Sequence, residues 1–175
     1  HLNFEVLNAR DLAYAMIANQ RAYDWDFMKF DFSGMYFPEA LGQKIPKPVH
    51  ADMQAWLNVD EWLINHPKDW LKVRPLKVKD SPIFTLNVEA VKRVCDYFQG
   101  DMPVLPTVFS PVSMAGECVA GYFDQEKLVK MFEYDIKELE YGLNVIEETL
   151  IGLMEAYVDA GAAGFFIGMQ NGLSY

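Results

Sequence analysis

Three short apolar runs in the pattern of hydrophobic and polar positions predict buried β-strands. Residues 27–32 alternate aromatic side chains with other residues and run into Ser33 and Gly34, as a strand does before a turn. Residues 102–109 and 164–169 are nearly continuous apolar runs, which are typical of strands buried on both faces. None of the three is followed by a glycine-rich phosphate-binding loop.

Between these strands lie segments whose apolar positions recur at intervals of three and four residues, as in a helix. This spacing predicts a helix over residues 9–22 with Asn8 as its N-cap, a short helix over residues 36–41, and a further helix capped by Asn87. Residues 113–120 predict another helix. Helices that alternate with buried strands indicate a parallel α/β fold, either a barrel or an open sheet.

The longest regular segment has Asp124 as its predicted N-cap and carries a seam of apolar side chains over residues 136–157. The seam spacing alternates between three and four residues, so it can also be interpreted as a coiled-coil surface that pairs with another chain. Gly142 and Gly152 weaken that interpretation, and the segment leads into the strand at residues 164–169. An alternative therefore stays open, in which the protein is a non-enzymatic binding or assembly module that associates with another copy through residues 136–157.

Residues 43–82 form an irregular excursion, because five prolines exclude a long central strand from most of this stretch. One short apolar helix is predicted near residues 59–64. Trp56, Trp62 and Trp70 lie in the same excursion. They are interpreted as anchors that hold a long loop on the body of the protein, with stacking on a substrate as the alternative.

The formal net charge of −10 argues against nucleic acid as a partner, because binding to phosphates needs a basic surface. No apolar run reaches the roughly 18 to 20 residues that a membrane span needs, and the first residues lack the pattern of a signal peptide. We therefore expect neither nucleic acid nor a membrane as a partner, and we expect the protein in the cytoplasm.

The two cysteines and three histidines form no disulfide or metal-binding pattern. Cys95 and Cys118 lie in apolar helical stretches, and none of His1, His50 and His66 is spaced with a cysteine as a ligand pair. No metal site is therefore expected within this chain. Cys118 is interpreted as a small buried side chain rather than a nucleophile.

Polar side chains at the carboxyl ends of the predicted strands are the candidate ligand-binding residues, because barrel enzymes bind their ligands at this end. Asp31 could accept N–H groups of a ligand, with a turn or helix-capping role as the alternative, and Lys29 two residues earlier is its expected ion partner. Ser110 is a hydrogen-bonding candidate and lacks a histidine partner for a nucleophilic triad. Gln170 could present its amide to a ligand carboxylate or satisfy loop backbone groups.

Three segments share their order and spacing with a known family of barrel enzymes. Residues 37–42, Phe-Pro-Glu-Ala-Leu-Gly directly after a predicted strand, are similar to that family's Pro-x-Ala-Leu-Gly segment after the second barrel strand. Residues 103–121 are similar to its third strand and proline-containing turn, and residues 155–170 to a helix and the fourth strand. On these segments the chain resembles the uroporphyrinogen decarboxylase superfamily.

The resemblance implies a (β/α)₈ TIM barrel, of which residues 1–175 supply a single segment with about strands two to four and their helices. The segment is then incomplete at both ends, either truncated or partly observed, and is expected to be inactive alone. A partial barrel leaves open sheet edges with unpaired backbone groups.

The superfamily has a decarboxylase branch and a methyltransferase branch. At the positions where decarboxylases carry an aspartate, a tyrosine and a serine, the resemblance places Ser33, Glu117 and Gly168. Three departures argue against decarboxylation of uroporphyrinogen, a tetrapyrrole. Tyr36 and Gln170 look more like the methyltransferase branch and uncharacterised members.

The methyltransferase branch moves a methyl group between a corrinoid carrier and a thiol, with zinc bound by residues of the C-terminal half, which is absent from this chain. The expected function is that of a corrinoid-linked methyltransferase acting on a small-molecule substrate, with zinc and a corrinoid protein as partners of the full-length protein. The resemblance assigns no catalytic residue. The resulting ligand-binding candidates are Asp31, Ser33, Tyr36, Ser110 and Gln170.

Overall fold

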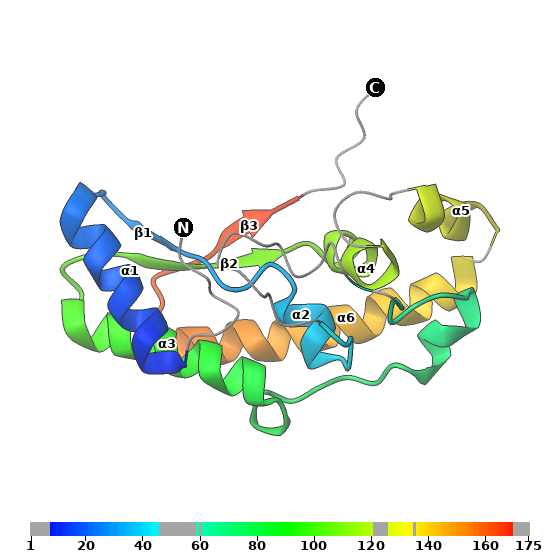
Figure 1. Cartoon of the computed structure of the whole chain (residues 1–175), viewed down its shortest axis with the longest axis horizontal. Coiled ribbons are helices and arrows are strands. Elements are labelled where there is room, and N and C mark those ends of the chain that lie inside the picture. Colours follow the sequence, from blue (N-terminus) through cyan, green and yellow to red (C-terminus); the bar gives the residue numbers. More distant parts are fainter. Residues whose placement is uncertain (1–7, 46–58, 60, 121–125, 135, 170–175) are drawn as a thin grey trace.

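The three predicted strands form one parallel sheet in a computed structural model that describes residues 8–45, 59, 61–120, 126–134 and 136–169. The strands are β1 (Met28–Phe30), β2 (Val104–Phe109) and β3 (Phe166–Gly168), in the order β1-β2-β3 (Figure 1). In the register, Met28 pairs with Val104 and Thr107 pairs with Phe166. The sheet is open among the described residues, since β1 and β3 are its edges. The prediction that the third strand is buried on both faces is wrong, because β3 lies at this open edge and Phe166 and Ile167 are exposed.

Helices connect the strands, and α3 and α6 lie together beneath the sheet in Figure 1. The α-helices are α1 (Ala9–Tyr23), α2 (Tyr36–Ala40), α3 (Pro82–Phe98), α4 (Pro111–Ala120), α5 (Glu126–Tyr134) and α6 (Ile136–Asp159). Two 3₁₀-helices, η3 (Pro67–Lys72) and η4 (Val78–Asp80), lie between α2 and α3. Within the described residues, no helix combines the length and the hydropathy that crossing a membrane requires.

Capping determines where α1 and α3 begin. The Asn8 side chain accepts a hydrogen bond from the Asp11 backbone N–H, which confirms the predicted cap of α1. The predicted cap of α3 is wrong: Ser81 caps that helix by accepting from Phe84 N–H, and Asn87 lies buried inside it. Pro82 explains the earlier start, because a proline at the first helical position has no N–H to leave unsatisfied.

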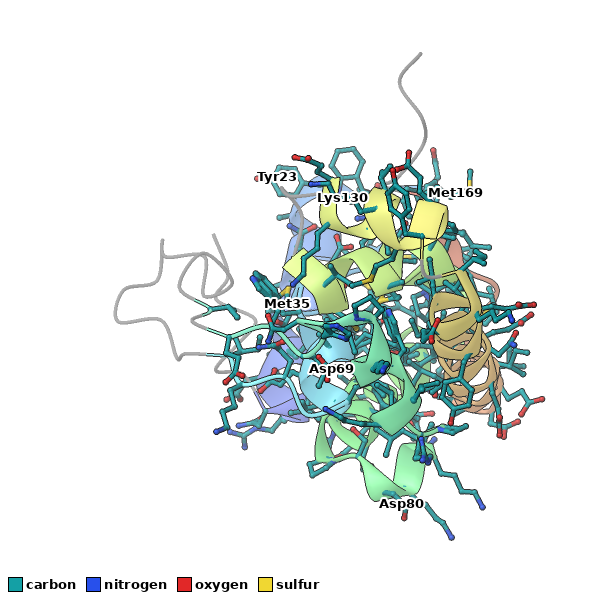
Figure 2. The ribbon with its side chains drawn as sticks, turned by 90° about the vertical axis from the view of Figure 1, so that its right-hand side faces the viewer. Tyr23, Met35, Asp69, Asp80, Lys130 and Met169 are labelled. Atoms are coloured by element: carbon teal, nitrogen blue, oxygen red, sulfur yellow. The ribbon has the colours of Figure 1, made fainter. Side chains whose placement is uncertain are left out.

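The short helix predicted near residues 59–64 is absent from the described residues of that stretch. Instead, the backbone N–H of Ile64 donates to the Cys118 carbonyl of α4, 3.1 Å away. A chain that gives its N–H groups to a distant helix cannot use them for a helix of its own. The 3₁₀-helices follow, near Asp69 and Asp80 in Figure 2.

Trp70 anchors this excursion on α6, as the sequence predicts for a loop tryptophan. Its side chain is fully buried, and its ring lies against Gly142, where an added Cβ would overlap the ring. Trp62 is half-buried, and Trp56 lies outside the described residues. Glycine at position 142 therefore leaves room for the Trp70 ring and does not interrupt the helix.

The apolar seam of α6 packs inside the chain and is not a free surface, and self-association through residues 136–157 stays a prediction. Most seam side chains are buried, and Ile136 at the beginning of the helix is exposed. The buried members are Leu139, Ile146, Leu150, Leu153 and Tyr157. The predicted cap at Asp124 lies outside the described residues, and the long segment comprises two helices, α5 and α6.

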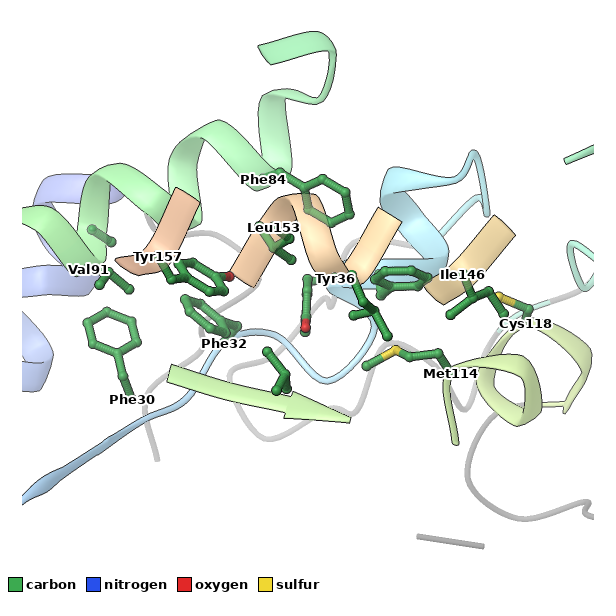
Figure 3. Packing of buried hydrophobic residues seen from close by; sticks show 14 of the residues in the cluster. Phe30, Phe32, Tyr36, Phe84, Val91, Met114, Cys118, Ile146, Leu153 and Tyr157 are labelled. Carbon is green, nitrogen blue, oxygen red and sulfur yellow. The ribbon is translucent and has the colours of Figure 1, made fainter. Parts of the chain in front are cut away.

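An aromatic layer fills the space between the sheet and the helices (Figure 3). Phe32, just after β1, stacks on Tyr157 of α6 with ring centroids 5.4 Å apart and an interplanar angle of 7°. Tyr36 contacts Phe32 and Phe84 of α3, at centroid distances of 5.4 Å and 6.2 Å. Each such pair adds about 0.5–1.5 kcal/mol beyond the burial of its apolar area.

We expect opposite effects from alanine at the two glycines of α6. Gly142→Ala should lower the free energy of unfolding by about 1–3 kcal/mol, because the new methyl group overlaps the Trp70 ring. Gly152→Ala is the matched control: nothing lies within 4 Å of its added Cβ, and it should stabilise the helix by about 0.5–1 kcal/mol. Urea unfolding measures both, and equal effects would contradict the packing of Trp70.

Candidate functional site

The candidate site lies on the face of the sheet opposite α3 and α6. In β1 the side chains of Met28 and Phe30 are buried, so Lys29 and Asp31 point to the other face, because successive strand residues alternate. The side chains of Lys29 and Asp31 are 41% and 42% exposed. The aromatic layer on one face thereby leaves the charged residues on the other.

A polar cluster on this face joins residues from all three strands. Asp31 Oδ1 accepts hydrogen bonds from Lys29 Nζ at 2.6 Å and from Thr107 Oγ1 at 2.8 Å. Lys29 Nζ also lies 4.9 Å from the centroid of the Phe166 ring. The predicted Lys29 and Asp31 ion pair is confirmed, and we call this set of four residues the sheet cluster.

Thr107 and Phe166 were not found from the sequence, although each lies in a predicted strand. Thr107 is the single hydroxyl residue in the apolar run of β2, and that is the signal that could have pointed to it. The parallel register sets Thr107 beside Phe166. Sequence periodicity alone does not contain this pairing between strands.

At the carboxyl end of β2, Ser110 holds the first turn of α4. Its Oγ accepts from the Ser113 backbone N–H at 3.2 Å and lies 2.9 Å from Ser113 Oγ. The Ser110 N–H donates to the carbonyl of Gly168, the last residue of β3, at 3.0 Å. Ser110 therefore acts as a helix cap and joins two strand ends, and its binding of a ligand stays a prediction.

Ser33 and Tyr36 occupy the turn after β1. The Ser33 carbonyl accepts from the Tyr36 N–H at 3.2 Å, and Tyr36 is 2% exposed in the aromatic layer. The structure thus puts Tyr36 in the core and does not bring it to the sheet cluster. Gln170 lies outside the described residues.

Gly168 leaves room for an aromatic ring at the end of β3. A Cβ added at Gly168 would lie 2.5 Å from Cδ1 of Phe109, closer than any side chain tolerates. A serine at this position could fit only if the Phe109 ring moved. Glu117, in α4, is 1% exposed.

Neither cysteine has the features of a nucleophile. Burial, the larger cause, and the neighbouring Glu117 raise the pKa of the fully buried Cys118 thiol. Burial also raises the pKa of the half-buried Cys95 thiol. Both shifts disfavour the thiolate, the reactive form. Among the described residues, no group of three or more His, Cys, Asp or Glu side chains could hold a metal ion.

Comparison with known proteins places this fold in a family. The family model of uroporphyrinogen decarboxylase (URO-D) matches residues 6–172, so the chain belongs to this family. A methyltransferase from Methanosarcina mazei has a similar structure, with a TM-score of 0.63 and 19% sequence identity, over 93% of this chain and 46% of that one. This chain therefore spans about half the length of that methyltransferase. A search of curated proteins finds no match.

We expect the hydrogen bond between Thr107 and Asp31 to contribute measurably to stability. Thr107→Val should lower the free energy of unfolding by about 1 kcal/mol, because the buried hydroxyl donates to an ionised carboxylate. In an Asp31→Ala background the same substitution should have little effect. A urea-unfolding double-mutant cycle measures the coupling, and equal losses in both backgrounds would show that the bond contributes nothing.

We expect slow and unequal labelling of the two thiols by a disulfide reagent. Since both thiols have a raised pKa, the thiolate fraction is small at neutral pH, and the labelling rate of Cys95 should still increase above the ordinary thiol pKa of about 8.5. Cys118 should react only after the protein has unfolded. The control is Cys95→Ser, and rapid labelling of that variant in its folded state would refute the burial of Cys118.

Proposed function

We propose that this chain forms strands two to four of a (β/α)₈ barrel whose interior wall is the open face of the sheet. Membership of the URO-D family and the consecutive parallel order of β1, β2 and β3 support this proposal. Strands at both edges of the sheet would pair with the remaining strands of the barrel. Closure of this kind removes the unpaired backbone groups of a sheet edge.

In such a barrel the ligand binds at the carboxyl ends of the strands, and the sheet cluster would line the interior wall next to it. Lys29 and Thr107 hold Asp31 Oδ1 in place, and Phe109 and Phe166 add an apolar wall. Enclosure would strengthen the electrostatic interactions of Lys29 and Asp31, because the interior of a barrel has a lower dielectric constant than water. The cluster is suited to orient a small molecule that has both a polar and an apolar part.

We propose that the full-length protein is a methyltransferase that acts with a corrinoid carrier and a small thiol. The single observation that carries this choice is the engagement of Asp31 Oδ1 by Lys29 and Thr107. A decarboxylase needs a carboxylate that accepts pyrrole N–H groups and stabilises a cationic intermediate. The carboxylate of Asp31 is already compensated by an ammonium group, and Ser33 and Gly168 replace two polar groups of the decarboxylases.

Zinc would need ligands from another part of the proposed barrel, because the described residues contain no group of side chains that fits it. The residues of this chain would instead position the substrate. Lys29 would supply positive charge. Asp31, held by Thr107, would fix the position of the Lys29 ammonium group. Errors of about 1 Å in such positioning cost up to about 100-fold in rate.

The test is methyl transfer by the full-length protein from methylcobalamin to a panel of small thiols, followed by absorbance. The thiolate sulfur should take the methyl group to give a thioether, and the electron pair of the broken Co–C bond should stay on cobalt. Asp31→Asn should reduce the rate by about 10- to 100-fold with an unchanged fold, because Lys29 loses its charged partner.

The matched control is Asp80→Asn on the exposed 3₁₀-helix η4, which should keep the full rate. Conversion of uroporphyrinogen to coproporphyrinogen with release of carbon dioxide would establish the decarboxylase alternative instead. An absence of methyl transfer to every thiol tested would also overturn the proposal.

A further inference from the structure

A groove of about 450 Å³ lies between helices α1 and α3, on elements that carry none of the sheet cluster. One face of each helix lines it, because the residues from each recur with helical spacing. The residues that matter for its chemistry are Arg10, Tyr14, Ile17 and Arg21 from α1, and Arg93 and Tyr97 from α3.

Arginine is concentrated at this groove, although the protein as a whole is strongly acidic. The chain has a formal net charge of −10 and four arginines, of which Arg10, Arg21 and Arg93 line this groove. Asp96 is the single acidic residue in the lining. Arginine suits carboxylate recognition, because its planar guanidinium can donate two parallel hydrogen bonds.

One of these arginines keeps its charge uncompensated within the described residues. Arg10 pairs with Asp11 at 3.4 Å and Arg93 with Glu89 at 2.6 Å. Arg21 forms no ion pair with any described residue, and its Nη1 donates to the neutral hydroxyl of Tyr97 at 3.1 Å. The Arg21 guanidinium could therefore donate further hydrogen bonds to a carboxylate that enters the groove.

Exposed aromatic side chains distinguish this groove from a simple anion site. Tyr14 is 71% exposed and Tyr97 is 49% exposed, and Ile17 is a half-buried apolar residue between the arginines. Tyrosine and arginine are enriched at protein–protein interfaces and among the residues that dominate binding energy. The combination fits a protein segment that has apolar as well as acidic side chains.

We propose that the groove docks an acidic, extended segment of a partner protein in which carboxylates and apolar side chains share the face that enters the groove. Arg10 and Arg21 are eleven positions apart on α1, which corresponds to about 16 Å along the helix axis. An extended segment of about five residues covers that distance, and its first, third and fifth side chains lie on the side that faces the groove. The proposal does not depend on the methyltransferase activity, because the groove and the sheet cluster share no residue.

The test uses the full-length protein and a fluorescein-labelled peptide of about six residues, with binding followed by fluorescence anisotropy. Glu and Leu alternate along one face of the extended peptide, and Ser occupies the positions between them. The peptide should bind, and the affinity should fall as salt is added, because exposed charges are screened. The variant that combines Arg10→Gln, Arg21→Gln and Arg93→Gln should raise the Kd about tenfold, the sum expected from three exposed ion pairs.

The control variant combines Lys77→Gln, Lys79→Gln and Lys137→Gln, which removes the same charge from exposed positions outside the groove. It should bind like the unmodified protein, and Tyr14→Ala should weaken binding while the circular dichroism spectrum is unchanged. Equal weakening by both triple variants, or equal affinity for a peptide with Gln in place of Glu, would refute specific docking. Loss of self-association in the arginine variant would identify a second copy as the occupant and overturn the proposal, as would no binding of the peptide.

Discussion

Aromatic packing beneath the first strand is the interaction on which the rest of this structure depends. Phe30 and Phe32 enter the layer between the sheet and the helices, and Phe32 stacks on Tyr157. Because side chains alternate along a strand, the burial of these two residues sends Lys29 and Asp31 to the opposite face. A slip of one residue would bury a lysine and an aspartate among aromatic rings, at a cost of several kcal/mol for each charge.

The ion pair of the sheet cluster therefore contributes little to stability, and it makes the open face of the sheet charged. A half-exposed ion pair such as that between Lys29 and Asp31 contributes about 0–1 kcal/mol, far less than the burial of the aromatic layer. The cluster also joins three strands that are distant in sequence. The buried aromatic layer, and not the ion pair, supplies most of the stability of this region.

The helical layer has its own chemistry, separate from that of the sheet. Glycine at position 142 lets the Trp70 ring lie against α6 and holds the irregular excursion on the body. On α1 and α3, the faces that do not pack in the core carry arginine and tyrosine. The two surfaces can act independently, because the aromatic layer separates the sheet from the helices.

The sequence by itself determined the strands, the cap of α1, the pairing of Lys29 with Asp31 and the burial of Cys118, because each rests on local periodicity or on residues close in the chain. The resemblance to the family rested on segments at 37–42, 103–121 and 155–170, and the family model that matches residues 6–172 confirms it. Tertiary structure alone decided that Thr107 and Phe166 join Asp31, that Tyr36 lies in the core, and that Ile64 donates to α4 instead of forming a helix. It also decided that the seam of α6 packs within the chain. These outcomes depend on register and on contacts between distant segments, and a linear pattern of hydrophobic and polar positions does not contain either one.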